Sequence, residues 1–216
     1  MQDFNSWYSS EIDLLKELYG SDEVARCLPR IREIFEFTEA KWGEYVRSLG
    51  KTPVRYLLIA EAPPWSEKDK EIQYVLDPAS RIRSFMGAIR GAFVDDRGAT
   101  AVECLAVLAK EGFLVVDSLP FAMEYTKKRS SKKYDQLISA TVSKYLQPKI
   151  KNSGLEWSPE VKVAFAVKRN ARSIMKSASK IELGGKEVAL SEEMIAVNGA
   201  GYPCAKRLKE NFQLRA

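Results

Sequence analysis

Four short apolar runs in this chain are each followed by polar or aromatic side chains that could do chemistry. The segments that follow the runs are residues 61–65, 117–121, 168–170 and 198–203. If the runs are strands of one parallel sheet, these segments meet at its carboxyl edge, where such sheets bind ligands. A pair of acids, a pair of basic residues, an amide and several aromatic rings would then share one crevice.

Glu61 and Asn198 are the candidate catalytic residues. A carboxylate at the sheet edge can position water or stabilise a cationic transition state, and an amide can donate hydrogen bonds to a leaving group. Each residue has another interpretation. Glu61 could cap a helix or pair with Arg169, and Asn198 could serve a turn because a glycine follows it. Asp117 is an alternative acid, or a cap for the loop that leads to Phe121.

Positive charge is the second feature that points to a ligand. The chain has 34 Lys and Arg residues against 29 Asp and Glu residues, a formal net charge of +5 that favours polyanionic partners. The segment TKKRSSKKY, residues 126–134, predicts either a solvated loop or a loop that contacts phosphates. Basic side chains also follow the third apolar run and open the last helix, where backbone amides could help to hold a phosphate. The candidate nucleic-acid-binding residues are Lys127, Lys128, Arg129, Lys132, Lys133, Lys168, Arg169, Lys206 and Arg207.

The composition excludes several classes of site. The chain contains no histidine, so it has no imidazole base and lacks the commonest metal ligand. Its three cysteines, Cys27, Cys104 and Cys204, are scattered and form no CxxC pair, so we expect no disulfide framework, metal or cofactor. No apolar run reaches the roughly 20 residues that span a bilayer. The first residues lack the order of a secretory signal, so we expect a cytoplasmic protein without membrane contact.

The scaffold that the hydrophobic pattern predicts is of the α/β class. The apolar runs VRYLLIA, FLVVDSL, VKVAFAV and EMIAV alternate with helical stretches, as in a parallel sheet buried on both faces. We predict a three-layer α/β/α sandwich with a mainly parallel central sheet of about four strands. A length of 216 residues fits a single domain, with residues 1–50 as an N-terminal helical region.

Local signals predict the helix boundaries in the N-terminal region. A helix with Ser10 as its cap should end at Gly20, and Gly50 should end the region. Pro29 would interrupt a helix or open a new one, and Thr38 would cap another. Further along the chain, Thr100 starts a capping-box pattern, a helix should end before Pro148, and the glycines at 184 and 185 predict a tight hairpin.

Four segments of the chain, taken in order, resemble the uracil-DNA glycosylase superfamily. They are LLIAEAPPWSE at residues 57–67, RSFMGAIRG at 83–91, VKVAFAVKRNARSI at 161–174 and IAVNGAGYPCAKRL at 195–208. Glu61, Ala62 and Pro63 match the centre of the first motif in the branch that reads Gly, Glu, Ala, Pro, Gly, whereas Ala60 and Pro64 replace its glycines. The resemblance covers residues 54–208, and it lacks the branch's cluster-binding cysteines and the histidine of the last motif.

The resemblance implies a protein that recognises, and excises from DNA, a damaged or deaminated base such as uracil. Cleavage of the N-glycosidic bond passes through a sugar cation and an anionic base, which a carboxylate and hydrogen-bond donors would stabilise. The base must first enter a pocket with an aromatic wall. Phe85 takes the stacking position in the resemblance, although its helical spacing from Ile82 and Ile89 also predicts core packing. The candidate substrate-binding residues are Ala62, Pro63, Trp65, Phe85, Asp117, Phe121 and Tyr202.

Two other functions remain open at the level of sequence. Without the histidine, the chain could bind nucleic acid in the same crevice and leave the base in place. A small-molecule α/β enzyme is the third reading, but no Gly-rich phosphate loop or GxSxG nucleophile elbow supports it. DNA is therefore the expected partner, whereas these features leave the preferred base and the oligomeric state undetermined.

Overall fold

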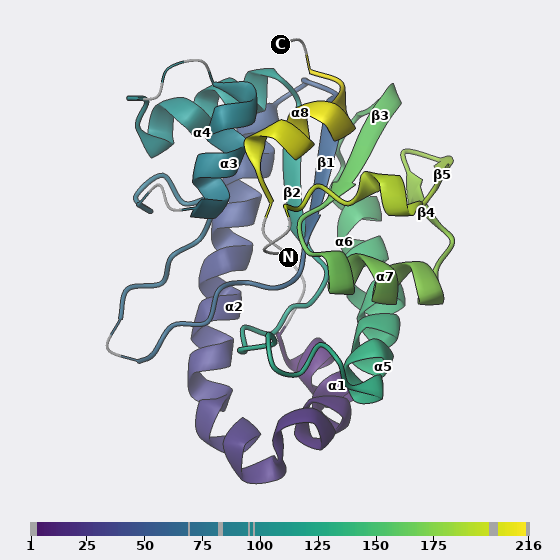
Figure 1. Ribbon diagram of the computed structural model, residues 1–216. Coiled ribbons are helices and arrows are strands. Elements are labelled where there is room, and N and C mark those ends of the chain that lie inside the picture. Colours follow the sequence, from purple (N-terminus) through teal and green to yellow (C-terminus); the bar gives the residue numbers. More distant parts are fainter. Residues whose placement is uncertain are drawn as a thin grey trace.

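A parallel three-stranded sheet forms the centre of the computed structural model, which describes residues 4–68, 70–81, 84–94, 96, 98–198 and 203–214. The strands are β1 (Val54–Ala60), β2 (Phe113–Asp117) and β3 (Trp157–Phe165), in the order β2-β1-β3 (Figure 1). Within the register, Ile59 of β1 lies between Val116 of β2 and Phe165 of β3. The predicted α/β class with a parallel sheet is confirmed, because the strands alternate with crossover helices as the pattern indicated.

The fourth apolar run does not form a strand. The short 3-10 helix η2 (Glu192–Met194) occupies its start, and a single parallel bridge joins Ile195 to Phe165. The Ala196 amide donates to the Phe165 carbonyl oxygen at 2.9 Å, but Val197 then pairs antiparallel with Pro203. The prediction of about four strands is thus corrected to three strands and one bridge, because the chain turns away from the sheet before a ladder can form.

Helix α2 (Ser21–Leu49) follows α1 (Phe4–Tyr19) and protects the free edge of the sheet. The Trp42 indole donates to the Val115 carbonyl oxygen at 3.1 Å, and the Tyr45 hydroxyl donates to the Phe113 carbonyl oxygen at 2.7 Å. These two carbonyls point away from β1, since alternate residues of β2 pair with that strand. The N-terminal helices therefore satisfy acceptors that an edge strand would otherwise expose.

The predicted helix breaks at Pro29 and Thr38 are wrong. Both residues lie inside α2, which is continuous over 29 residues, and the Thr38 hydroxyl donates to the Phe35 carbonyl oxygen. A proline inside a helix costs about 3 kcal/mol. Burial of one face, including Ile31 and Ile34, offsets that cost, because each fully buried side chain contributes about 1.5–3 kcal/mol.

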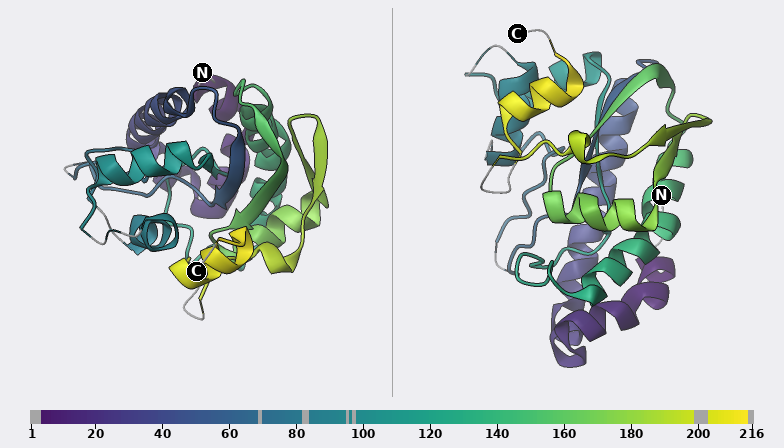
Figure 2. Two further views of the ribbon diagram at one scale, coloured as in Figure 1. Left: turned by 90° about the horizontal axis from the view of Figure 1, so that it is seen from above. Right: turned by 45° about the vertical axis from the view of Figure 1, so that its right-hand side comes forward.

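Two further layers of helices surround the sheet. Helix α8 (Ala205–Phe212) lies on the opposite side of the sheet from α2 (Figures 1 and 2), and it packs against α3 (Ser84–Phe93), which in turn contacts α4 (Ala101–Lys110). An aromatic cluster joins this group to the sheet, with the Phe93 and Phe113 ring centroids 4.9 Å apart and those of Tyr56 and Phe212 5.4 Å apart. On another side, α5 (Lys132–Thr141) packs against α1 and α7 (Lys168–Ser177). These helices cover the sheet on both faces, as the sandwich prediction requires.

Three local predictions can be compared with the structure. Thr100 and Glu103 form the expected capping box at the start of α4, and Gly184 and Gly185 have φ of +57° and +80° in the turn between β4 (Lys180–Leu183) and β5 (Lys186–Ala189). The expected helix end before Pro148 is wrong: α5 continues through a π-helical turn (Val142–Leu146) into α6 (Gln147–Lys151). Pro148 stands in the first turn of α6, directly after the π-helical turn, in which the Gln147 amide donates to the Val142 carbonyl oxygen. Within the described ranges, no helix is both long and apolar enough to cross a membrane.

Candidate functional site

Glu61 stands immediately beyond β1 and is tied to the end of β2. Its carbonyl oxygen accepts hydrogen bonds from the Leu119 amide at 2.8 Å and from the Ser118 hydroxyl at 3.0 Å. These bonds continue the pairing of the two strands past their last residues. The Glu61 side chain is consequently held at the carboxyl edge of the sheet, where the sequence predicted it.

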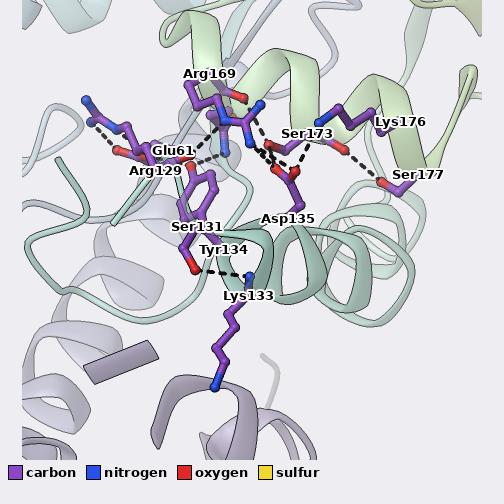
Figure 3. Close-up of polar contacts among 11 residues, drawn as sticks. Glu61, Arg129, Ser131, Lys133, Tyr134, Asp135, Arg169, Ser173, Lys176 and Ser177 are labelled. Carbon is purple, nitrogen blue, oxygen red and sulfur yellow. Dashed lines mark hydrogen bonds and ion pairs between the residues drawn. The ribbon is translucent and has the colours of Figure 1, made fainter. Parts of the chain in front are cut away.

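The Glu61 carboxylate is bound on both oxygens. The Arg129 guanidinium donates from Nε to Oε1 at 2.8 Å and from its terminal nitrogen to Oε2 at 2.5 Å (Figure 3). The Tyr134 hydroxyl donates to Oε1 at 2.6 Å. Burial and the Glu61 charge raise the pKa of Tyr134, so its hydroxyl keeps the proton that it donates. Glu61 thus pairs with Arg129, not with Arg169 as one interpretation of the sequence suggested.

Arg169 supports this pair from the first turn of α7. Its Nε donates to the Arg129 carbonyl oxygen at 2.7 Å, while its terminal nitrogen donates to both Asp135 carboxylate oxygens at 2.9 Å. The Asp135 carboxylate also accepts from Ser173 and Lys176, at 2.5 and 3.0 Å (Figure 3). Burial opposes the charge, but Ser173, Lys176 and Arg169 together hold the pKa of Asp135 below its ordinary value. The two ion pairs fix the basic segment against α7.

Asn170 adds an unsatisfied acceptor to the cluster. Its side chain is completely buried, and its Nδ2 donates to the Ser118 hydroxyl at 2.9 Å and to the Tyr134 hydroxyl at 3.4 Å. Its Oδ1 has no hydrogen-bond partner among the described residues. A buried acceptor without a partner costs about 1–3 kcal/mol. The cluster therefore contains one buried acceptor whose hydrogen-bonding capacity the described residues leave unused.

Sequence reasoning missed the roles of Ser118, Tyr134 and Asn170. Ser118 and Asn170 lie in segments 117–121 and 168–170, which the strand-end rule placed at this edge without assigning a role to either residue. Tyr134 gave no comparable signal, because it lies in α5 and meets Glu61 only through tertiary packing. Together, Glu61, Arg129, Tyr134, Asn170 and Ser118 define the carboxylate cluster of this protein.

Asn198, a predicted partner from the end of the chain, donates no hydrogen bond to the Glu61 carboxylate. Asn198 is exposed beyond the Ile195 bridge, and it is not among the donors to Glu61. Tyr202 falls outside the described residues. The predicted pairing of an acid on one rim with the Asn198 amide on the other therefore has no direct contact in the described structure.

The aromatic residues that were candidates for the wall of a base pocket lie in three different environments. Phe121 is fully buried and meets the Phe4 ring edge-on at 6.3 Å, so it belongs to the core and forms no open wall. Phe85 is half-buried on α3 and packs against the core, as its helical spacing predicted. Trp65 is half-buried between two surface hollows of about 450 and 350 Å³. Of its neighbours, Ala62 is half-buried and Pro63 is buried.

Asp117 belongs to a separate buried cluster rather than to the Glu61 site. Its carboxyl group hydrogen-bonds with Tyr74, and burial raises its pKa to about 7, with Glu39 adding to the rise and Lys149 opposing it. Glu39 and Lys149 form a buried ion pair, and the Lys149 ammonium lies 4.6 Å from the Trp42 ring centroid. The alternative acid of the sequence analysis is therefore part of the interior between β2 and α2.

The predicted basic residues divide into inward and outward groups. Arg129 points inward to Glu61, whereas Lys127 and Lys132 are exposed in the same segment. The remaining side chains have partners or positions elsewhere on the surface: Lys128 over the Tyr19 ring, Lys133 with Glu17, Lys168 exposed at the start of α7, and Lys206 and Arg207 with Glu210 on α8. The structure brings the residue 127–133 segment and the start of α7 together. Lys206 and Arg207 instead pair with Glu210 on their own helix, α8.

Comparisons of the chain with protein-family models, with curated proteins and with solved structures found no match. In the part of the chain that the structure describes, no group of three Cys, Asp or Glu side chains is arranged to hold a metal ion.

Proposed function

We propose that this chain is a glycosylase-like protein that recognises a damaged or deaminated base in DNA and acts on its N-glycosidic bond. One observation carries the proposal: Glu61, Tyr134 and Asn170 form a bonded cluster at the carboxyl edge of a parallel sheet, beside a basic segment. That edge is where this class of sheet places its ligands.

The cluster offers the groups that cleavage of an N-glycosidic bond requires. As the bond breaks, positive charge develops on the sugar, and a nearby carboxylate such as Glu61 can stabilise it or orient the attacking water. If entry of a base exposes the buried Asn170 side chain, its free acceptor suits an N–H group on the edge of that base. Exposed Lys127 and Lys168 beside the cluster would contact phosphates.

A second candidate is binding of nucleic acid without excision. It is favoured by the occupied carboxylate, since Arg129 and Tyr134 already use both oxygens of Glu61. The absence of histidine from the chain points the same way, because the resembling family uses one in its last motif.

One experiment separates the two candidates. The protein is incubated with oligonucleotides that contain uracil, hypoxanthine or xanthine, and abasic sites are revealed by alkaline cleavage while binding is measured in parallel. Excision that disappears in Glu61→Ala but persists in Glu160→Gln supports the first candidate, because Glu160 is an exposed acid on β3. Binding without abasic sites supports the second, and the absence of both refutes the proposal.

A further inference from the structure

Arg129 is placed so that its guanidinium could leave the Glu61 carboxylate and bind another anion. Its side chain is 28% exposed, whereas the Glu61 side chain that it holds is 10% exposed. The Arg129 side chain therefore keeps partial access to solvent while its guanidinium forms two bonds to the carboxylate. Its backbone is anchored separately, because the Arg129 carbonyl oxygen accepts from Arg169.

The surroundings of Arg129 favour a phosphate as the competing anion. Lys127 and Lys132 are exposed on either side of it in the chain, and Lys168 is exposed at the start of the adjacent α7. These charges raise the local concentration of a polyanion. A guanidinium binds phosphate oxygens in the same two-pronged geometry with which it binds a carboxylate.

We propose that Arg129 is a latch on Glu61 that a nucleic-acid phosphate releases. In the unbound protein the latch neutralises Glu61 and occupies its second oxygen. When a phosphodiester takes the guanidinium, Glu61 keeps only the bond from Tyr134, and Oε2 becomes available to water or to the sugar of the ligand. The inference rests on the proposed function, because it assigns a regulatory contact to that same site.

If Arg129 is a latch, removing the negative charge of Glu61 should raise the affinity for nucleic acid. Binding has to break the Arg129–Glu61 pair, so the energy of that pair is subtracted from the affinity. Glu61→Gln weakens the pair but retains an acceptor for Tyr134, and it should raise the affinity for a single-stranded oligodeoxynucleotide about tenfold, because a neutral amide holds the guanidinium less strongly than a carboxylate does. Glu160→Gln makes the same change in net charge on an exposed strand residue and should change the affinity less than twofold.

The binding experiment uses fluorescence anisotropy of a labelled oligodeoxynucleotide at a constant ionic strength of roughly 0.15 M, where distant surface charges are screened. The double variant with Glu61→Gln and Arg129→Gln leaves no buried charge unpaired, and it should bind more weakly than Glu61→Gln alone. In parallel, NMR follows the Arg129 Nε–Hε resonance, which is assigned by its disappearance in Arg129→Lys. Its chemical shift should change when the oligonucleotide is added. Inorganic phosphate at the same concentration should shift the resonance less, and an equal shift would overturn the assignment of the release to nucleic acid.

The outcomes distinguish the latch from the function on which it rests. Binding that Glu61→Gln leaves unchanged or weakens overturns the latch and leaves nucleic-acid recognition standing. Absence of binding by the wild type and by every variant overturns both. A gain of affinity that Glu160→Gln reproduces attributes the effect to net charge and also overturns the latch.

Discussion

Asp117→Asn should remove the pH dependence of the free energy of unfolding that the buried Asp117 carboxyl group causes. Asp117 is 4% exposed and shares its surroundings with one buried cation, Lys149, and one buried acid, Glu39. Two carboxylates beside a single ammonium hold one proton more readily than two separated carboxylates would. Burial is the main reason that the pKa of Asp117 is raised to about 7.

The sign of the effect follows from proton binding in the two states. The unfolded chain releases the Asp117 proton near pH 4, whereas the folded protein retains it until about pH 7. This group therefore stabilises the fold fully below about pH 4, and the contribution is lost as the pH rises to about 7. Across three pH units at about 1.4 kcal/mol each, the upper limit is about 4 kcal/mol.

The asparagine side chain imitates the protonated carboxyl group at every pH. We expect the free energies of unfolding of wild type and variant to agree near pH 4, and the variant to become the more stable by up to about 4 kcal/mol near pH 8. Urea denaturation at pH 4, 5, 6, 7 and 8, followed by tryptophan fluorescence, measures the difference. A difference that does not change with pH would falsify the assignment of the proton to this cluster.

Asp135→Asn is the matched control, because it makes the same chemical change at a carboxyl group whose pKa is shifted downward. That carboxylate contributes stability above the unfolded pKa, and the contribution is lost as the pH falls below about 4. The variant should therefore be less stable than wild type at pH 7, by roughly 1–3 kcal/mol because Arg169 and Lys176 lose their partner. Its difference from wild type should shrink toward acid pH, opposite in sign to that of Asp117→Asn.

Three further substitutions test the packing and hydrogen bonding around the sheet. Gly112→Ala should destabilise the fold by several kcal/mol, since its Cβ would lie 2.2 Å from the Pro53 carbonyl oxygen, whereas Gly154→Ala, with the same φ of +68° and open space, should cost only about 1–2 kcal/mol. Equal losses of thermal stability would contradict this steric argument. Tyr45→Phe should cost about 1–3 kcal/mol in chemical denaturation, because the Phe113 carbonyl at the strand edge loses its donor. An unchanged unfolding midpoint would show that the bond contributes nothing.

Local sequence determined the elements whose stabilising contacts lie within a few residues. The capping box at Thr100 and the two-glycine hairpin at Gly184 follow from hydrogen bonding and backbone conformation over three or four positions. The first three apolar runs form parallel strands because they are too short for helices and alternate with helical segments. Glu61 could be placed at the sheet edge for the same reason, since it follows such a run directly.

Tertiary structure decided what Glu61 touches and where helices continue. Arg129 is 68 residues from Glu61, and no local pattern specifies that a guanidinium in a basic segment will turn inward while its neighbours face solvent. Pro29 stays helical because long-range burial of the helix face outweighs a local penalty. Side-chain chemistry was thus readable from the residues, but the state of each group, paired or free, depends on the fold because charge pairing and burial are set by neighbours distant in the chain.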